Sequence, residues 1–167
     1  MPQPTFVVIK GWTIFAHPLF IDELDKLITQ LSNNKLKDQN TYKTKNSYKI
    51  LAAIYKLAFD VIPTDPAHKD YRQAETLGQE HKHWFRAKFF QQYRLFFRFE
   101  STAKIIVYAW VNNEKNKRAY ESKNDAYRTF EKMLKKGHPP DDFDVLLKES
   151  KAVQKKINLM LNKISSI

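Results

Sequence analysis

Three short segments between residues 84 and 111 alternate in side-chain character with a period of two. They span residues 84–90, 93–99 and 104–111. This is the period of a β-strand, whose successive side chains point to opposite faces of a sheet. Because the connections are only two and four residues long, the pattern predicts an antiparallel meander at the centre of the chain. Neither connection contains glycine, so the turn types are not predicted.

The segments on both sides of the meander show mainly the apolar spacing of helices. The predicted elements are a strand at 5–10, helices at about 18–32 and 42–62, the meander, and helices from about 125 and 142. The polar stretch 63–83 has no period and predicts a long surface connection. This order is typical of an α+β fold, and 167 residues suffice for a single domain spanning 1–167.

Positive charge is concentrated in one quarter of the sequence. Residues 81–120 carry nine lysines and arginines against two acidic residues, which is +7 of the formal net charge of +11. Concentrated positive charge attracts polyanions and gives affinity that depends on salt. The sequence therefore predicts a nucleic acid as partner. The alternative is a basic surface that only aids solubility, and the concentration of the charge in one quarter of the chain argues against this interpretation.

Basic side chains share one face of the first two meander strands. Alternation places Arg86 and Lys88 together on the first strand, and Arg94 and Arg98 together on the second. If the strands pair so that all four project the same way, they form a cationic floor for the phosphates of an RNA chain. Solvated strand faces also carry lysine and arginine, so any one of them has an ordinary alternative interpretation.

The loop after the meander adds further polar and basic groups. Lys117, Arg118, Tyr120 and Lys123 lie in it, and Tyr127 falls in the first turn of the next helix. The predicted RNA-binding residues are Arg98, Lys117, Tyr120 and Lys123. A tyrosine beside cations can stack on an unpaired base or transfer a proton. Each tyrosine taken alone is more often a packing residue.

Several classes of function are disfavoured by composition. There is no cysteine for a thiolate nucleophile or a cysteine-bound zinc, and three scattered glycines make no nucleotide-binding loop. His81 and His83 form the closest histidine pair, but no further ligand lies at suitable spacing in the sequence, so we predict neither metal nor cofactor. No segment has the length of a membrane span or the layout of a signal peptide, and we expect a cytoplasmic protein.

Four stretches of the sequence resemble one bacterial toxin family. They are residues 11–20, 93–99, 125–127 and 132–140, and the likeness runs in one order from about residue 10 to 147. The chain resembles the YhaV-type toxins, which are similar in turn to the wider RelE superfamily. The resemblance implies a small antiparallel sheet with helices packed on one face and an RNA site on the other. Residues after about 148 fall outside it and form a possible helical extension.

The resemblance also implies an activity. It is the toxin of a type II toxin–antitoxin system, an endoribonuclease (mRNA interferase) that cleaves mRNA, on the ribosome, without metal or cofactor, and so stops translation and growth. The RNA 2′-hydroxyl attacks its own phosphate. By motif, the catalytic set is Arg86, Lys88, Arg94, Arg118 and Tyr127. Lys88 and Tyr127 both remain candidates for the general base, although the loop holding Arg118 is longer than in compact RelE toxins.

The remaining expectations concern partners and folding. The resemblance implies a PrlF-like antitoxin with a SpoVT/AbrB-like DNA-binding region, and leaves self-association open. A non-catalytic RNA- or DNA-binding module is the alternative function, and cleavage of labelled RNA in EDTA distinguishes the two. In the fold, Arg86, Lys88 and Arg94 are expected to share an exposed concavity. Buried positions are expected at Leu51, Ile54, Leu95, Phe97, Val107 and Phe130.

Overall fold

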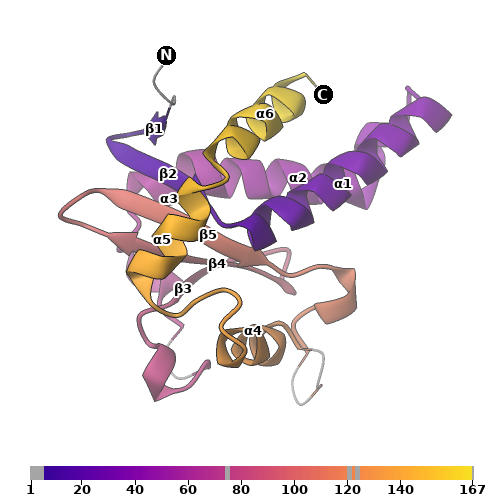
Figure 1. Cartoon of the computed structure of the whole chain (residues 1–167). Helices are drawn as coiled ribbons and strands as arrows, with labels where there is room; N and C mark the ends of the chain where they lie inside the picture. The colour runs from indigo at the N-terminus through magenta and orange to yellow at the C-terminus, as the bar shows by residue number, and fades with distance from the viewer. Residues whose placement is uncertain (1–5, 74–75, 120–121, 123–124, 167) are drawn as a thin grey trace.

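The computed structural model describes residues 6–73, 76–119, 122 and 125–166. A five-stranded sheet lies between two groups of helices (Figure 1). Its strands are β1 (Val7–Ile9), β2 (Trp12–Ala16), β3 (Phe85–Phe89), β4 (Tyr93–Glu100) and β5 (Ile105–Val111). The main helices are α1 (Pro18–Lys37), α2 (Asn46–Lys56), α4 (Ala126–Lys135), α5 (Phe143–Lys151) and α6 (Gln154–Ser165). The predicted α+β class is confirmed.

The sheet has the order β1-β2-β5-β4-β3, which places β5 at its centre. The predicted meander is confirmed, since β3 pairs antiparallel with β4 and β4 with β5. β2 was not predicted as a strand, because Gly11 was interpreted as an end rather than a turn. Lys10 and Gly11 both have left-handed φ, 51° and 85°, and reverse the chain between β1 and β2. β2 then runs parallel to β5, so the sheet is mixed rather than wholly antiparallel.

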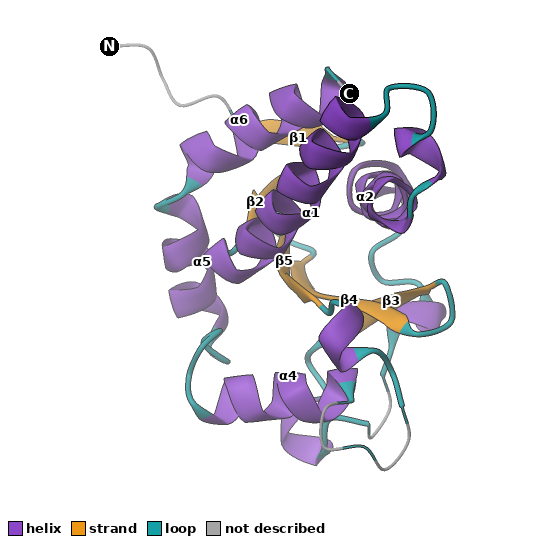
Figure 2. Ribbon diagram, turned by 90° about the vertical axis from the view of Figure 1, so that its right-hand side faces the viewer, coloured by secondary structure: helices purple, strands orange, loops and turns teal. Residues whose placement is uncertain are grey.

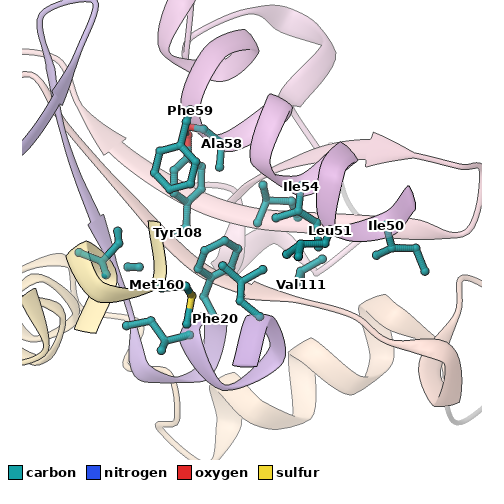
Figure 3. Packing of buried hydrophobic residues seen from close by; sticks show 14 of the residues in the cluster. Phe20, Ile50, Leu51, Ile54, Ala58, Phe59, Tyr108, Val111 and Met160 are labelled. Atoms are coloured by element: carbon teal, nitrogen blue, oxygen red, sulfur yellow. The ribbon is translucent and has the colours of Figure 1, made fainter. Parts of the chain in front are cut away.

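One face of the sheet, here called the first face, is covered by α1, α2 and α6 (Figure 2). Figure 3 shows its centre, where Tyr108 lies between Phe20 and Phe59. The Tyr108 hydroxyl donates to the carbonyl of Ala58, so the phenol is not left unpaired in an apolar core. Leu51, Ile54, Leu95 and Phe97 are buried here as predicted.

The opposite, second face is not open. α4 lies across it in Figure 2, and Phe130 stacks on Phe96 with ring centres 4.2 Å apart. Val107 is buried in the same cluster, so Val107 and Phe130 also meet their predictions. Helices were expected on one face only. The expectation fails because the sheet presents Phe96, Val107 and Trp110 to this side, and an amphipathic α4 buries its own stripe against them.

Two predicted helices are interrupted. The one expected at 42–62 consists of a 3-10 turn at Tyr42–Thr44, α2, a wider helical turn at Leu57–Val61, and α3 (Ile62–Thr64). The last one breaks after Lys151, which turns α6 onto the first face, where Ile157 and Met160 are buried. The connection 63–83 holds two further 3-10 turns, at Lys69–Tyr71 and Gln79–His81. None of the described helices is long and apolar enough to span a bilayer.

Candidate active site

Two arginines and a tyrosine meet on the second face. Arg86 in β3 and Arg94 in β4 both donate through Nε to the hydroxyl oxygen of Tyr127, at 2.8 and 3.0 Å. Register explains the convergence: Arg86 lies opposite Phe96, so it shares a face with Arg94 two residues earlier on β4. Tyr127 reaches them from the first turn of α4. The three residues are called the arginine–tyrosine cluster below.

These two contacts use the acceptor capacity of the Tyr127 hydroxyl oxygen. A phenol oxygen offers two lone pairs and one proton. Because two guanidinium groups occupy the lone pairs, the O–H proton is left to donate to a third group. In this geometry the Tyr127 hydroxyl can act as a hydrogen-bond donor, whereas its lone pairs already accept from the two arginines.

Each arginine also keeps donors for a ligand. Arg86 Nη1 donates to the carbonyl of Asp70 at 2.6 Å, and Arg94 Nη1 donates to the carbonyls of Gln91 and Tyr93 at 2.8 and 2.9 Å. Among the described residues no hydrogen bond uses the Nη2 group of either arginine. In the described part of the chain, the only fully buried side-chain polar atoms that lack a hydrogen-bond partner belong to Gln154. The Nη2 groups of Arg86 and Arg94 are therefore not of this kind. Two amino groups therefore remain available to an anion.

Asp125 holds the rest of the site together. It is 1% exposed and caps α4, accepting from the backbone N–H of Tyr127 at 3.0 Å. Its other oxygen accepts from Arg118 Nη1 at 2.7 Å and from the Ala119 amide at 2.6 Å. Burial alone would raise the pKa of this carboxyl, but the hydrogen bonds from Arg118 and Ala119 outweigh it and lower the pKa below its usual value. Asp125 is thus an ionised partner at neutral pH.

Arg118 joins the cluster through the ring of Tyr127. Its guanidinium carbon lies 4.7 Å from the ring centre, and that of Arg94 lies 5.7 Å from it. Cations over a tyrosine ring are attracted by the negative face of the π system. Three guanidinium groups therefore lie around one phenol, and Asp125 forms an ion pair with one of them, that of Arg118.

The turn between β3 and β4 is built into the same site. Phe90 and Gln91 both have left-handed φ, 44° and 62°, although neither is glycine. Asn112, at the end of β5, accepts from the Arg94 amide at 2.6 Å and donates to the Gln92 carbonyl at 3.0 Å. Asn112 and Asp125 are positioning residues that were absent from the predicted site. The signal for them was weak, because asparagine and aspartate in loops usually only shape turns.

Four predicted site residues therefore come together: Arg86, Arg94, Arg118 and Tyr127. Lys88 is exposed beside them, directly opposite Arg94 in the sheet. The expectation that Arg86 and Arg94 are exposed is wrong, since they are 8% and 7% exposed. The cause is α4, which covers the second face and brings Tyr127 against both guanidinium groups.

Three predicted RNA-binding residues lie elsewhere or outside the description, and a fourth flanks the cluster. The Arg98 guanidinium lies between the rings of Trp84 and Phe143, 5.3 Å from each, and donates to the carbonyl of Asp141. Burial lowers its pKa, against the opposing effect of Asp141, and the side chain is packed into the fold. Lys117 is half-buried beside Arg118. Tyr120 and Lys123 lie outside the described residues.

Comparison with known proteins assigns the chain to a family. Residues 14–151, which include the whole arginine–tyrosine cluster, match the model of the YhaV toxins, described as toxins with endonuclease activity of a toxin–antitoxin system. The chain belongs to the YhaV toxin family. As a member of this family it is a toxin with endonuclease activity, and its partner is an antitoxin.

Curated relatives agree with this assignment. Over 144 residues, the chain is 39% identical to the ribonuclease toxin YhaV of Escherichia coli strain K12, covering 85% of this chain and 94% of that protein. The toxin YhaV of Escherichia coli O157:H7 matches with the same identity and coverage. No solved structure matches significantly. The family resemblance and the endonuclease activity predicted from the sequence are confirmed.

Proposed function

We propose that this YhaV-family toxin is an endoribonuclease that cleaves mRNA on the ribosome, in the cytoplasm, by a reaction that uses no metal ion. The observation that carries the proposal is the arginine–tyrosine cluster, in which two guanidinium groups hold one phenol and keep unpaired donors. A relative with 39% identity is named a ribonuclease. Arginine forks match the geometry of phosphate oxygens, so an RNA backbone is the substrate that the site favours.

The chemistry follows from the RNA itself. The 2′-hydroxyl oxygen attacks the adjacent phosphorus, the bond from phosphorus to the 5′-oxygen breaks, and a cyclic phosphate and a free 5′-hydroxyl result. Arg86 and Arg94 stabilise the extra negative charge of the pentavalent phosphorus through their Nη2 groups. Such preorganised charges typically contribute about 3–4 kcal/mol each to the barrier. They do the electrostatic work for which other nucleases use a metal.

Two proton transfers complete the reaction. One proton leaves the 2′-hydroxyl and one arrives at the 5′-oxygen. In this proposal Tyr127 donates the proton to the 5′-oxygen, which is supported by the two hydrogen bonds that its lone pairs already accept. Lys88 is exposed next to Arg94 and is the candidate for receiving the 2′-hydroxyl proton. Its protonated form would instead add a further cation beside the phosphate.

The test is cleavage of end-labelled RNA in EDTA by the purified chain and by Tyr127→Phe and Arg86→Gln. The wild type should leave cyclic-phosphate ends, and each variant should lose about 100-fold or more in rate. Tyr55→Phe, on the exposed side of α2, makes the same chemical change far from the site and should cleave normally. Both variants remove contacts of buried groups, so rates are compared at temperatures where far-UV circular dichroism shows every protein folded.

Binding of RNA without any cleavage by the wild type would refute the nuclease proposal and favour a non-catalytic RNA-binding module. Full activity of Tyr127→Phe and Arg86→Gln would place the chemistry elsewhere in the chain.

We further propose that the antitoxin is a PrlF-like protein with a SpoVT/AbrB-like DNA-binding region, and that acidic side chains of it cover the cluster. The excess of +7 in residues 81–120 supports an acidic partner surface. Association should then slow as salt increases. Co-purification of the chain with the product of its neighbouring gene, and growth only when both are expressed, is the expected result; equal growth without that product would contradict it.

A further inference from the structure

A second cluster on the second face joins two segments that are far apart in sequence. His81 and His83 precede β3, and Asp141 lies in the connection between α4 and α5. Asp141 Oδ1 is 3.2 Å from His81 Nδ1 and 2.8 Å from His83 Nε2. One nitrogen or oxygen of each side chain lies within 4.8 Å of the others. This group is called the histidine–aspartate cluster below.

Asp141 Oδ1, which all three contacts share, has more possible hydrogen-bond donors around it than it has lone pairs. Trp84 Nε1 also approaches Asp141 Oδ1, at 2.8 Å. An indole N–H can only donate, and a carboxylate oxygen has two lone pairs. One lone pair therefore remains for two imidazole nitrogens. A cation would remove this conflict, because the two imidazole nitrogens would then give lone pairs to it instead of competing to donate hydrogen to one oxygen.

The two separations that involve Asp141 fit a small tetrahedral ion. Nitrogen and oxygen ligands lie about 2.0–2.1 Å from zinc, which places two tetrahedral ligands roughly 3.3 Å apart. The separations of 3.2 and 2.8 Å from Asp141 Oδ1 to the two imidazole nitrogens are close to this value. Two imidazoles with one carboxylate are a ligand set that zinc accepts readily.

We propose that His81, His83 and Asp141 bind a Zn²⁺ ion that links the segment before β3 to the connection between α4 and α5. Solvent supplies the fourth ligand, since the side chains of His83 and Asp141 are 37% and 42% exposed. This zinc joins two segments of the chain and goes beyond the proposed nuclease chemistry, because the arginine–tyrosine cluster shares no residue with it.

Outer contacts hold the ligands in place. The Gln73 side chain donates to the His81 carbonyl at 2.8 Å and accepts from the Leu77 amide at 3.0 Å. Arg98 donates to the Asp141 carbonyl, and the Trp84 indole orients its carboxylate. Such outer-shell partners reduce the movement needed for metal binding and are typical of zinc sites.

The decisive experiment is calorimetric titration of zinc chloride into tag-free, full-length protein after removal of metals with a chelator. The wild type should bind one zinc per chain. His83→Ala should weaken binding by more than about 100-fold, the upper limit for loss of an outer-shell partner, because it removes a direct ligand. His68→Ala is the matched control, since His68 is a half-exposed imidazole that faces one carboxylate, Asp70, at 3.5 Å.

Thermal melting gives a second measurement. Zinc should raise the melting temperature of the wild type and of His68→Ala, but not that of His83→Ala, because a ligand that binds only the folded state stabilises it. Cobalt in place of zinc should give the visible absorption of a tetrahedral site. Absence of saturable zinc binding by the wild type, or equal affinity in His83→Ala, would overturn the proposal. RNA cleavage is assayed separately, and far-UV circular dichroism of the wild type in the same EDTA buffer shows whether it stays folded without zinc, so either proposal can fail without the other.

Discussion

The two faces of the sheet use the same strands for different purposes. The first face packs aliphatic and aromatic side chains from β4 and β5, such as Leu95 and Tyr108, against three helices. The second face alternates aromatic residues with charged ones, with Phe96 between the buried Arg94 and the partly buried Arg98 on β4. Buried charge without a partner is costly, so its presence needs compensation by hydrogen bonds. The difference indicates that the first face mainly stabilises the fold, whereas the second face carries the site for which we propose the nuclease chemistry.

Removing a large ring from the first face should have the largest effect. Phe97→Ala deletes a fully buried side chain and should lower the free energy of unfolding by about 3–5 kcal/mol. Urea denaturation measures the loss. Cleavage per folded molecule should stay near the wild-type rate, and a specific loss of cleavage in the folded fraction would break the comparison between the faces.

The matched change on the second face should reduce cleavage strongly and stability only moderately. Arg94→Gln removes a guanidinium that holds Tyr127 and should slow cleavage by about 100- to 1,000-fold. Stability should fall less than in Phe97→Ala, because glutamine still offers a side-chain amide to the turn carbonyls. Single-turnover cleavage and urea denaturation separate the two effects. Lys163→Gln, an exposed charge on α6, serves as the control for loss of charge.

A smaller effect on stability is expected at Asp125. Asp125→Ala removes the cap of α4 together with the partner of Arg118, and should cost about 2–3 kcal/mol. Asp142→Ala removes only the cap of α5, where Asp142 accepts from the Val145 amide at 3.0 Å, and should cost about 1 kcal/mol. Cleavage should fall in the first variant alone. Equal costs and equal activity would show that Asp125 is merely a helix cap.

The smallest effect should appear as a pH dependence. Burial lowers the pKa of His17, against the opposing effect of Glu149, and His138 and Asp22 act on it more weakly. The folded pKa is therefore below the unfolded value of about 6.5, and the unfolded chain binds the proton more readily. Stability from this group is complete above about pH 6.5 and is lost as pH falls toward the folded pKa.

His17→Asn tests this dependence, since asparagine can still cap α1 as His17 does through the Leu19 amide. Between pH 7.5 and 5, the variant should lose less stability than the wild type in urea denaturation. A steeper loss in His17→Asn would show that protonated His17 is stabilised by Glu149 instead.

Local patterns were sufficient for the meander and for the two arginines of the arginine–tyrosine cluster, whereas Tyr127 was implied by the family resemblance. Alternation along β3 and β4 puts Arg86 and Arg94 on one face whatever the helices do, and a basic stretch marks that face as a site for anions. The turn at Phe90 and Gln91 was not predictable, because its left-handed residues are not glycines. Similarly, β2 begins directly after Gly11, so in the sequence Gly11 looks like the end of the first strand rather than a turn between two strands.

The sequence by itself determined the α+β class, the basic strand face and the family, because these depend on periods and motifs carried by neighbouring residues. Only the tertiary structure decided that α4 buries the arginines, that Asp125 anchors Arg118, and that Asp141 meets two histidines about sixty positions earlier. Such contacts depend on how helices and loops close over a sheet. Periodicity along the sequence predicts which side chains share a face of one element, but not which distant segments pack against it.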